Sequence, residues 1–336
     1  LVPRLLVPRA TFDPDAAAYL HAVEAADGQA LETPVKNAVD DFIKGCKADG
    51  IWDAIKASCI LCGARTLAGA LVPLAGDAPT NVNNNFVEAD YNRETGLKGD
   101  GSTKYLNSNR ANDADLKDDK HISAYATNLG NDSGVVRGLL FAGTGGTSGS
   151  AGIGYRNSDE LSTFQVNNAT STFASGLSAG FVGASRSTGT EFLYRQNNSN
   201  STALQASESP IASDVLVYSR VGNLTSARLA FYSIGSSPGP DPATGLAALD
   251  TRVTALVQRI QLFLRSIDEE GMDRDALAYI RNVEAADGGY LELGVKQAID
   301  QFVRGCKYDG IWDAIKASCI LCGARTLAGA LTPLVG

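Results

Sequence analysis

The stretch IWDAIKASCILCGARTLAGAL occupies Ile51–Leu71 and occurs again, letter for letter, at Ile311–Leu331. The two copies lie 260 residues apart (311 − 51). The same offset aligns Asp13–Leu74 with Asp273–Leu334, with 46 identical residues over 62 positions. Similarity this long at one fixed offset indicates a duplicated structural module. The copies bracket a middle region of different composition, so the predicted order is module, insert, module.

The size and charge of the chain bound its function. Its 336 residues are enough for two or three domains with cores of their own. Hydrophobic residues make up 44 % and charged residues 20 %, which is typical of globular proteins. The formal net charge of −8 argues against a nucleic-acid partner, because phosphate contacts need clustered Lys and Arg. No apolar run reaches the roughly 20 residues of a membrane-spanning helix, so no membrane partner is expected.

The first twelve residues, Leu1–Phe12, are interpreted as an N-terminal arm. They contain the motif LVPR twice and no apolar segment long enough for a signal peptide. Two interpretations stay open, an arm that pairs with a neighbouring molecule and a cloning remnant.

Each module, residues 13–74 and 273–336, is predicted to be a small helical bundle. In the first copy, a capping Asp13 and apolar residues at helical spacing predict a helix that ends at Asp27-Gly28. A second helix is predicted from about Leu31 to Asp49-Gly50. A third is predicted from Ile51 to about Gly63, and a short fourth within Arg65–Leu74.

The unchanged repeat contains one tryptophan per copy, Trp52 and Trp312. It could form the tight core of a small bundle or a docking surface for another protein, and the two interpretations are compatible. The 16 differences between the copies all lie outside the 21-residue segment. A recent duplication alone would not confine the differences in this way, so we expect a docking surface that includes Trp52 and Trp312.

Each module carries three of the six cysteines, and the insert carries none. The cysteines are Cys46, Cys59 and Cys62 in the first module and Cys306, Cys319 and Cys322 in the second. Structural zinc needs four ligands, and a cysteine-only site here would have three, so no metal or other cofactor is expected. Two alternatives stay open. One is a disulfide from Cys46 to Cys59 or Cys62, with Cys306 and Cys319 as the matching pair; the other is free thiols packed as small apolar groups.

The insert, residues 75–238, is rich in Gly, Ser, Asn and Thr and changes from helical spacing to two-residue alternation. Many short strands separated by turn-rich pieces predict an antiparallel sandwich or barrel. The candidate strands are His121–Thr127, Val135–Ala142, Ile153–Arg156, Ser162–Val166, Gly180–Ser185, Glu191–Arg195, Asp214–Ser219 and Ala227–Ile234.

Several runs of the insert resemble the concanavalin/laminin-G-like jelly-roll modules of bacteriophage virion proteins. These are TGLKGDGSTKYLNSN (Thr95–Asn109), KHISAYAT (Lys120–Thr127) and SARLAFYSIG (Ser226–Gly235). The helical module, with AVEAADG and GCKADGIWDAIKASCILCGARTLAGALVPL, looks like the bundle that accompanies such jelly rolls in phage tail-fibre and related structural proteins. The tandem second bundle departs from the expected arrangement.

The resemblance implies a non-enzymatic structural protein on the outside of a virion, on its tail or head. In this interpretation the jelly roll attaches to a host-surface glycan, and the helical modules dock to other virion proteins. The alternative is a capsid decoration or head-fibre protein that binds no receptor. Jelly rolls bind sugars through aromatic side chains and amides, and Tyr155, Tyr194 and Asn198 are the candidate contacts.

A carbohydrate-active enzyme is the less favoured interpretation. Glycosidases need two carboxyl groups across a cleft, roughly 5 to 10 Å apart. One cluster of acidic residues lies in a predicted loop of the insert and indicates solvated surface or a calcium-tolerant loop. Its members are Asp113, Asp115, Asp118 and Asp119. No catalytic residue is therefore proposed.

Residues 243–267, which follow a proline-rich hinge, predict a connecting helix. Apolar residues recur there with spacings of 3 and 4 over about three heptads. This pattern favours either a seam between copies of the chain, with a trimer preferred, or a helix that covers the sandwich or the second bundle. The candidate seam residues are Leu249, Val253, Leu256, Ile260 and Phe263. The complete prediction is an α+β multidomain chain whose antiparallel jelly roll is flanked by two homologous helical bundles.

Overall fold

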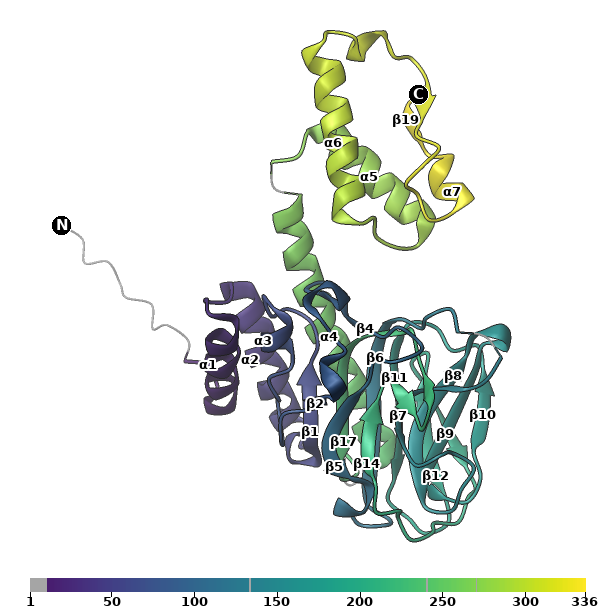
Figure 1. Cartoon of the computed structure of the whole chain (residues 1–336). Helices are drawn as coiled ribbons and strands as arrows, with labels where there is room; N and C mark the ends of the chain where they lie inside the picture. Colours follow the sequence, from purple (N-terminus) through teal and green to yellow (C-terminus); the bar gives the residue numbers. More distant parts are fainter. Residues whose placement is uncertain (1–10, 133, 240, 270) are drawn as a thin grey trace, which may run out of the picture. The chain divides into compact units, whose positions relative to one another are not determined.

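The computed structural model describes residues 11–132, 134–239, 241–269 and 271–336. Most of the predicted N-terminal arm, residues 1–10, lies outside them. The chain divides into two compact units, Leu1–Phe263 and Leu264–Gly336 (Figure 1). The first predicted module, the insert and most of the connecting helix, expected as separate domains, therefore form one unit.

The insert folds as a sandwich of two antiparallel sheets, so the predicted α+β class is confirmed. The first sheet has the order β13 (Ser199–Ala203), β12 (Phe192–Gln196), β11 (Gly180–Arg186), β6 (Lys120–Asn128), β17 (Arg228–Gly235), β4 (Gly96–Lys98), β3 (Tyr91–Asn92). The second has the order β10 (Thr172–Ser175), β9 (Leu161–Asn168), β8 (Ser150–Arg156), β7 (Arg137–Ala142), β14 (Asp214–Val217), β5 (Leu106–Ala111), β2 (Thr80–Asn81). A short hairpin pairs β15 (Ser219–Arg220) with β16 (Asn223–Leu224).

Alternate residues of the strands fill the space between the two sheets, as the two-residue periodicity predicts. Ile122, Ala124 and Ala126 of β6 share one core cluster with Leu140 and Phe164 of the opposite sheet. All eight candidate strands overlap observed strands, although the last part of Asp214–Ser219 belongs to β15. The predicted strands therefore mark the central part of each sheet, and the outer strands β13, β10 and β2 to β5 were missed.

One missed strand shows why the edges are harder to recognise. The polar, turn-rich run Gln196–Thr202 contains a hairpin in which only Asn197 and Asn198 turn. Both have positive φ, 50° and 60°, which asparagine tolerates in two-residue hairpin turns. The polar residues after them form β13, whose first four residues are exposed.

The first module, residues 13–74, begins with the two expected helices, α1 (Pro14–Asp27) and α2 (Thr33–Ala48). The Asp13 carboxylate accepts a hydrogen bond from the backbone N–H of Asp15, and Gly28 ends α1 in the left-handed conformation (φ 68°). The predicted short fourth helix is also present, as α3 (Leu67–Ala70).

The predicted third helix, Ile51–Gly63, is wrong. A single 3-10 turn, η1 (Trp52–Ala54), is followed by a strand, β1 (Ile55–Ile60), which pairs antiparallel with β17 of the sandwich. A short apolar run fits a helix or a buried strand equally well, so periodicity could not decide between them. The tertiary structure decides in favour of a strand. β4 pairs with only part of one side of β17, and β1 pairs with the rest of that side as a further strand of the first sheet.

The connecting helix α4 (Pro242–Asp268) confirms the prediction for 243–267. Its N-terminal part packs on the outer face of the first sheet: Arg195 of β12 forms an ion pair with Asp250 at 2.7 Å, and a Cβ on Gly183 of β11 would lie 3.0 Å from Leu246. The glycine therefore lets the helix approach the sheet closely.

The second unit contains module 2, residues 273–336, with the same order of elements. The helices α5 (Arg274–Asp287) and α6 (Leu293–Tyr308) are followed by η6 (Trp312–Ala314), β18 (Ser318–Cys319), α7 (Leu327–Ala330) and β19 (Pro333–Val335). A small core of its own includes Tyr279, Ile280 and Val303. Among the described residues, no helix combines the length and apolarity needed to cross a membrane.

Candidate docking interface

The repeat segment of module 1 meets the sandwich through β1. Its pairs with β17 run from Ala57 opposite Ile234 to Ile60 opposite Phe231. Two side-chain contacts fix this register: the Ser58 hydroxyl donates to the backbone oxygen of Tyr232 at 2.7 Å, and the Tyr232 hydroxyl donates to Cys59 Sγ at 3.4 Å. Main-chain pairing supplies the attachment, and the side chains select the register.

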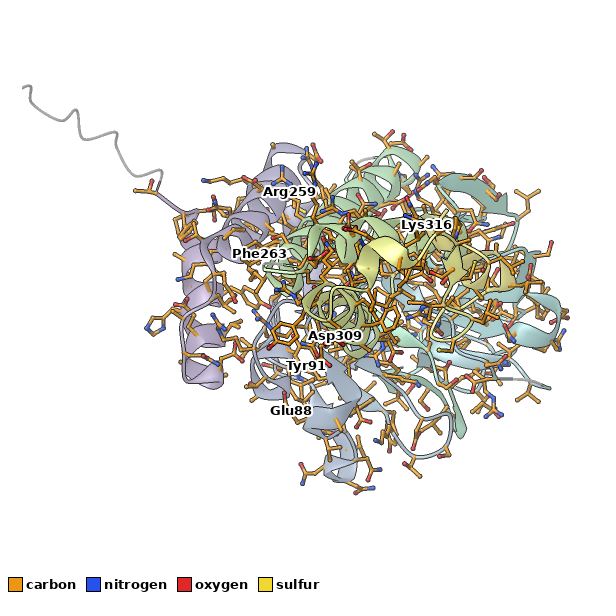
Figure 2. The ribbon with its side chains drawn as sticks, turned by 90° about the horizontal axis from the view of Figure 1, so that it is seen from above. Glu88, Tyr91, Arg259, Phe263, Asp309 and Lys316 are labelled. Atoms are coloured by element: carbon orange, nitrogen blue, oxygen red, sulfur yellow. The ribbon has the colours of Figure 1, made fainter. Side chains whose placement is uncertain are left out.

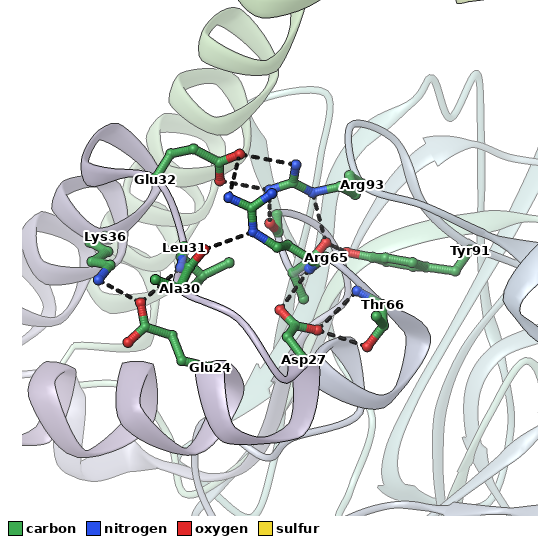
Figure 3. Close-up of polar contacts among 12 residues, drawn as sticks. Glu24, Asp27, Ala30, Leu31, Glu32, Lys36, Arg65, Thr66, Tyr91 and Arg93 are labelled. Carbon is green, nitrogen blue, oxygen red and sulfur yellow. Dashed lines mark hydrogen bonds and ion pairs between the residues drawn. The ribbon is translucent and has the colours of Figure 1, made fainter.

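An arginine from the sandwich closes one end of this interface (Figure 3). The Arg93 guanidinium donates to both carboxylate oxygens of Glu32, at 3.2 and 2.8 Å, and to the backbone oxygens of Gly63 and Ala64. The Tyr91 hydroxyl also donates to Ala64, at 2.7 Å. Burial alone would raise the pKa of Glu32, but the hydrogen bonds and charge of Arg93 outweigh it and lower the pKa. Glu32 is thus held ionised as the acceptor of a bidentate pair.

Inside the module, one carboxylate at the end of α1 holds the repeat in place (Figure 3). Asp27 accepts hydrogen bonds from the backbone N–H groups of Arg65 and Thr66, at 2.7 and 2.9 Å, and from the Thr66 hydroxyl at 2.7 Å. The Thr66 hydroxyl in turn caps α3 by accepting from the N–H of Gly69. This arrangement positions the loop that leads from β1 to α3.

Helices α2 and α4 complete the interface. The Phe42 ring of α2 packs edge-on against Phe231 of β17, with ring centroids 5.8 Å apart. Arg252 of α4 donates to the Asp49 carboxylate at 2.7 and 3.0 Å. Arg259 of α4, labelled in Figure 2, forms an ion pair with Asp41. Module 1 is therefore held by a strand, an aromatic contact and a polar rim.

Module 2 keeps the internal arrangement of module 1. Asp287 accepts from the N–H groups of Arg325 and Thr326 at 2.8 and 3.0 Å, and from the Thr326 hydroxyl at 2.6 Å, as Asp27 does in module 1. Ser318 pairs with Val335, as its counterpart Ser58 forms a bridge with Ala75. The two copies thus share their local structure.

The outward surfaces of the two copies differ sharply. Leu61 and Leu67 are 0 % and 8 % exposed in module 1, whereas their counterparts Leu321 and Leu327 are 72 % and 75 % exposed. Three more positions change in the same direction: Ile311, Phe302 and Cys319 are exposed, and Ile51, Phe42 and Cys59 are buried. The surface that module 1 buries against the sandwich is therefore presented to solvent in module 2.

The predicted docking residues Trp52 and Trp312 are half-buried and have contacts inside their own modules. The Trp52 indole N–H donates to Asp15 at 3.1 Å, and Lys47 lies 6.0 Å from its ring centre. Trp312 packs on the core of module 2, with Lys307 5.5 Å from its ring centre. The side chains that meet the sandwich come from β1 and α2, which moves the candidate surface away from the tryptophans.

All six cysteines are free thiols, so the alternative of a disulfide between Cys46 and Cys59, or between Cys306 and Cys319, is wrong. Cys46, Cys59 and Cys62 are buried among apolar side chains, and burial raises the pKa of each thiol to about 12. Cys319 and Cys322 are exposed. Within the described residues, no group of three or more His, Cys, Asp or Glu side chains could hold a metal ion.

The candidate glycan contacts do not form an exposed platform. Tyr155 is 5 % exposed and belongs to the sandwich core, and Tyr194 is half-buried and stacks on Phe164 at 4.5 Å. Both tyrosines lie on the inward faces of their strands, so predicting them as sugar contacts was wrong. Asn198 is exposed in its hairpin turn, and the exposed aromatic side chain in the described part of the sandwich is Phe173 of β10, at 56 %.

The predicted seam between chains is also wrong for most of its residues. Leu249, Val253, Leu256 and Ile260 are at most 1 % exposed, because α4 buries them within the first unit. Phe263, labelled in Figure 2, is half-buried. The second alternative, a helix that covers the sandwich, accounts for the heptad pattern. The predicted homo-oligomer thereby loses the seam on which it rested.

The acidic loop is not simply solvated surface. Asp115 is 7 % exposed and forms ion pairs with Arg110 and with Lys120, the latter at 3.2 Å. Burial alone would raise the pKa of Asp115, but the Arg110 hydrogen bond and the charges of both cations lower it. Asp119 accepts a hydrogen bond from the N–H of Ser237 at 2.7 Å. The loop is therefore tied to the start of β6 and to the segment after β17.

No protein-family model matches the chain. No curated protein matches it either. Solved structures with partial likeness include a sialidase from Trypanosoma rangeli, with 9 % identity and a TM-score of 0.40, which covers 66 % of this chain and 39 % of the sialidase.

Two further solved structures are similar to part of the chain. The binding domain of botulinum neurotoxin serotype D has 12 % identity and a TM-score of 0.39, covering 67 % of this chain and 53 % of that domain. The sialyllactose-bound CBM40 of a Ruminococcus gnavus sialidase has 14 % identity and a TM-score of 0.30, covering 40 % and 83 %. The chain thus spans well under two thirds of the length of the sialidase and of the toxin domain.

Proposed function

We propose that the chain is a structural component of a bacteriophage particle that works by attachment rather than catalysis. In this proposal the helical modules dock to other particle proteins, and the sandwich faces outward toward a glycan of the host surface. The observation that supports it is the repeat segment, which is seated on a β-sandwich in module 1 and exposed, with the same sequence, in module 2.

The state of the acidic loop favours attachment over sugar hydrolysis. A general acid of a glycosidase needs a carboxyl group with a raised pKa. The pKa of Asp115 is lowered instead, and its carboxylate is engaged by Arg110 and Lys120. Its surroundings suit a buried ion pair that fixes the loop, not a proton donor to a leaving group.

The docking half of the proposal is tested by particle assembly. The full chain and a chain that carries Leu321→Glu and Leu327→Glu are supplied to particles that lack the protein. Because both leucines are more than 70 % exposed, the charges leave the fold intact and disrupt only an apolar contact. We expect incorporation of the variant to fall at least tenfold. Incorporation equal to that of the unmodified chain would contradict docking through module 2.

The adhesive half is tested with the full chain on a glycan array. Reproducible binding to a set of related glycans is expected, and Asn198→Ala with Phe173→Ala should reduce it if the exposed edge near β10 and the β12–β13 turn is the site. If no glycan on the array binds while incorporation into particles is normal, the adhesive half of the proposal is contradicted and the chain is a decoration protein.

A further inference from the structure

Module 1 shows how the repeat segment can be buried, because the sequence that is exposed in module 2 is buried against the sandwich in module 1. Helix α6, η6 and β18 present to solvent the residues whose counterparts contact β17 and α4. We propose that module 2 docks onto a second polypeptide that carries a β-sandwich of the same kind, with an unpaired outer strand like β17 beside a helix like α4. This rests on the docking half of the proposed function and names its partner.

The backbone of module 2 offers a free strand edge for such a partner. In module 1 the N–H of Ser58 donates to Ala75, on one side of β1, and the N–H of Leu61 donates to Ala230 of β17, on the other side. In module 2 the first of these sides is satisfied by the pairing of β18 with β19. The side that faces β17 in module 1 has no strand beside it among the described residues of module 2. An open strand edge flanked by exposed leucines is a template for strand addition.

The side chains needed for docking are also preserved in module 2. Residues of module 1 that contact the sandwich or α4 have identical counterparts 260 positions later, in the segment and outside it. These counterparts are Glu292, Phe302, Asp309, Ser318, Cys319 and Leu327, for Glu32, Phe42, Asp49, Ser58, Cys59 and Leu67. Glu32, Phe42 and Asp49 lie outside the unchanged segment, where 16 of 41 aligned positions differ, yet all three are kept. Asp41, which pairs with Arg259, is not kept, since Gln301 replaces it.

These residues define the chemistry of the partner. Glu292 and Asp309 are exposed, so the partner needs arginines placed as Arg93 and Arg252 are for module 1. The exposed Phe302 needs an aromatic ring placed as Phe231 is for Phe42. Leu321 and Leu327 need an apolar core such as the one in which Leu61 and Leu67 are buried. A free outer strand must lie between the two. A flat apolar patch, a lone helix or a nucleic acid would leave the strand edge or the carboxylates without partners.

The test uses full-length chains in which module 1 no longer fills its site. In Cys59→Pro, proline removes an N–H that lies on the same side of β1 as that of Leu61, which donates to Ala230, so β1 loses its pairing with β17. Module 2 of one copy can then dock on the vacated sandwich of another. We expect the mass of the Cys59→Pro chain, measured by sedimentation velocity, to rise with concentration. The Cys319→Pro chain and the chain that carries both prolines should keep the mass of the unmodified chain.

Two further measurements keep the test decisive. Association should protect the exposed thiols of Cys319 and Cys322 from a thiol reagent. Adding Leu321→Glu to Cys59→Pro should abolish the association. The variant Glu32→Arg with Asp49→Arg and Leu61→Glu sets like charges opposite Arg93 and Arg252 and places a carboxylate in the apolar core where Leu61 is buried, so it vacates the site without a proline in β1.

The proposal is overturned if the charge-reversed chain keeps its native near-ultraviolet circular dichroism and sediments with a mass independent of concentration up to about 100 μM. It is also overturned if association persists in Leu321→Glu, because the contact would then not involve the repeat. Neither measurement uses a particle or a glycan. A failure here, with particle incorporation still dependent on module 2, would leave the proposed function standing and exclude only this partner.

Discussion

The two copies of the repeat have the same sequence and the same local structure, but one is interior and the other is surface. In both, a 3-10 turn, a capped four-residue helix and an aspartate bound to two backbone N–H groups recur with hydrogen-bond lengths within about 0.1 Å of each other. In module 1 the sandwich strand β17 lies beside β1, whereas the matching β18 of module 2 pairs, among the described residues, with β19 of its own module. Short-range sequence therefore sets the internal geometry of the module, and the neighbouring sheet decides whether its apolar face is buried.

The comparison also shows what holds the sandwich and module 1 together. If the repeat served only as the core of a small bundle, its leucines and cysteines would be buried in both copies. They are buried in one, so their main role is contact with something outside the module. We therefore predict four measurable differences between the two copies, of which thiol reactivity is the largest and the effect of one ion pair the smallest.

The largest expected difference is in thiol reactivity. Cys319 and Cys322 are exposed, whereas Cys59 and Cys62 are at most 2 % exposed and burial raises the pKa of both to about 12. With Ellman's reagent at pH 8, two of the six thiols should react at once. The others should react at least about 1,000-fold more slowly, because each needs an opening that costs roughly 4 kcal/mol or more.

Matched variants assign the fast phase. Cys319→Ser with Cys322→Ser should remove it, and Cys59→Ser with Cys62→Ser should leave it unchanged. All six thiols should titrate after unfolding, since none is in a disulfide. A native chain with four or more fast thiols would mean that module 1 is not docked in solution.

The second difference is in the free energy of unfolding when the same leucine is truncated in each copy. Leu61→Ala should destabilise the first unit by about 3 kcal/mol, because it leaves a cavity in the core between module and sandwich. Leu321→Ala should change the second unit by less than about 0.5 kcal/mol.

Each unit contains one of the two tryptophans, so urea unfolding can follow the units separately. Fluorescence of Trp52 in a Trp312→Phe chain reports the first unit, and fluorescence of Trp312 in a Trp52→Phe chain reports the second. Equal losses for the two leucine variants would mean that Leu321 is buried in solution, by a partner or by self-association.

The sequence predicted the parts of this fold that depend on local pattern. The caps at Asp13 and Gly28, the long helix after residue 242 and the central strands of both sheets follow from spacing and turn chemistry. The strand β1 could not be predicted in this way. The same IKASCI forms only the two-residue β18 in module 2, and the six-residue strand of module 1 has β17 beside it, 174 residues away for the contact between Ser58 and Tyr232.

The candidate site was predicted in the right segment but with the wrong residues. Tryptophan is a typical anchor of interfaces, and Trp52 was predicted as a docking residue. Its indole N–H instead donates to Asp15 of its own module. Two β-branched residues, Ile55 and Ile60, at the ends of a six-residue run were the available strand signal. The heptad pattern of α4 was real, but whether Leu249 faces another chain or its own sandwich depends on packing that periodicity does not encode.

The third difference is a histidine-dependent loss of stability in acid, which is confined to the first unit because both histidines lie in it. His121 is fully buried. Its Nδ1 lies 2.6 Å from the Ser236 carbonyl oxygen, which can only accept, so Nδ1 carries the proton and Nε2 accepts from Ser233 at 2.9 Å. Burial lowers the pKa of His121 to about 4. The unfolded chain, with an ordinary pKa near 6.5, therefore binds more protons between these values.

Stability of the first unit should accordingly be full above pH 6.5 and fall as the pH drops toward 4, by up to about 3 kcal/mol. Urea titrations followed through Trp52 at several pH values measure the slope. His121→Gln should flatten it between pH 6.5 and 4, and the exposed His21→Gln should leave it unchanged. An undiminished slope in His121→Gln would assign the acid response to carboxylates instead.

The smallest expected difference concerns the ion pair that joins module 1 to α4. The side chains of Asp49 and Arg252 are 27 % and 37 % exposed, so solvent screens their attraction and Asp49→Asn should cost the first unit at most about 0.5–1 kcal/mol. The matched Asp309→Asn should leave the second unit unchanged, because α4 of the first unit supplies the arginine only for module 1. The cost of Asp49→Asn should vanish in about 1 M NaCl, where the Debye length falls to roughly 3 Å. A cost that persisted in salt would assign Asp49 to hydrogen bonding rather than to charge, and a partner of module 2 would then need a shaped donor opposite Asp309 and not merely a positive surface.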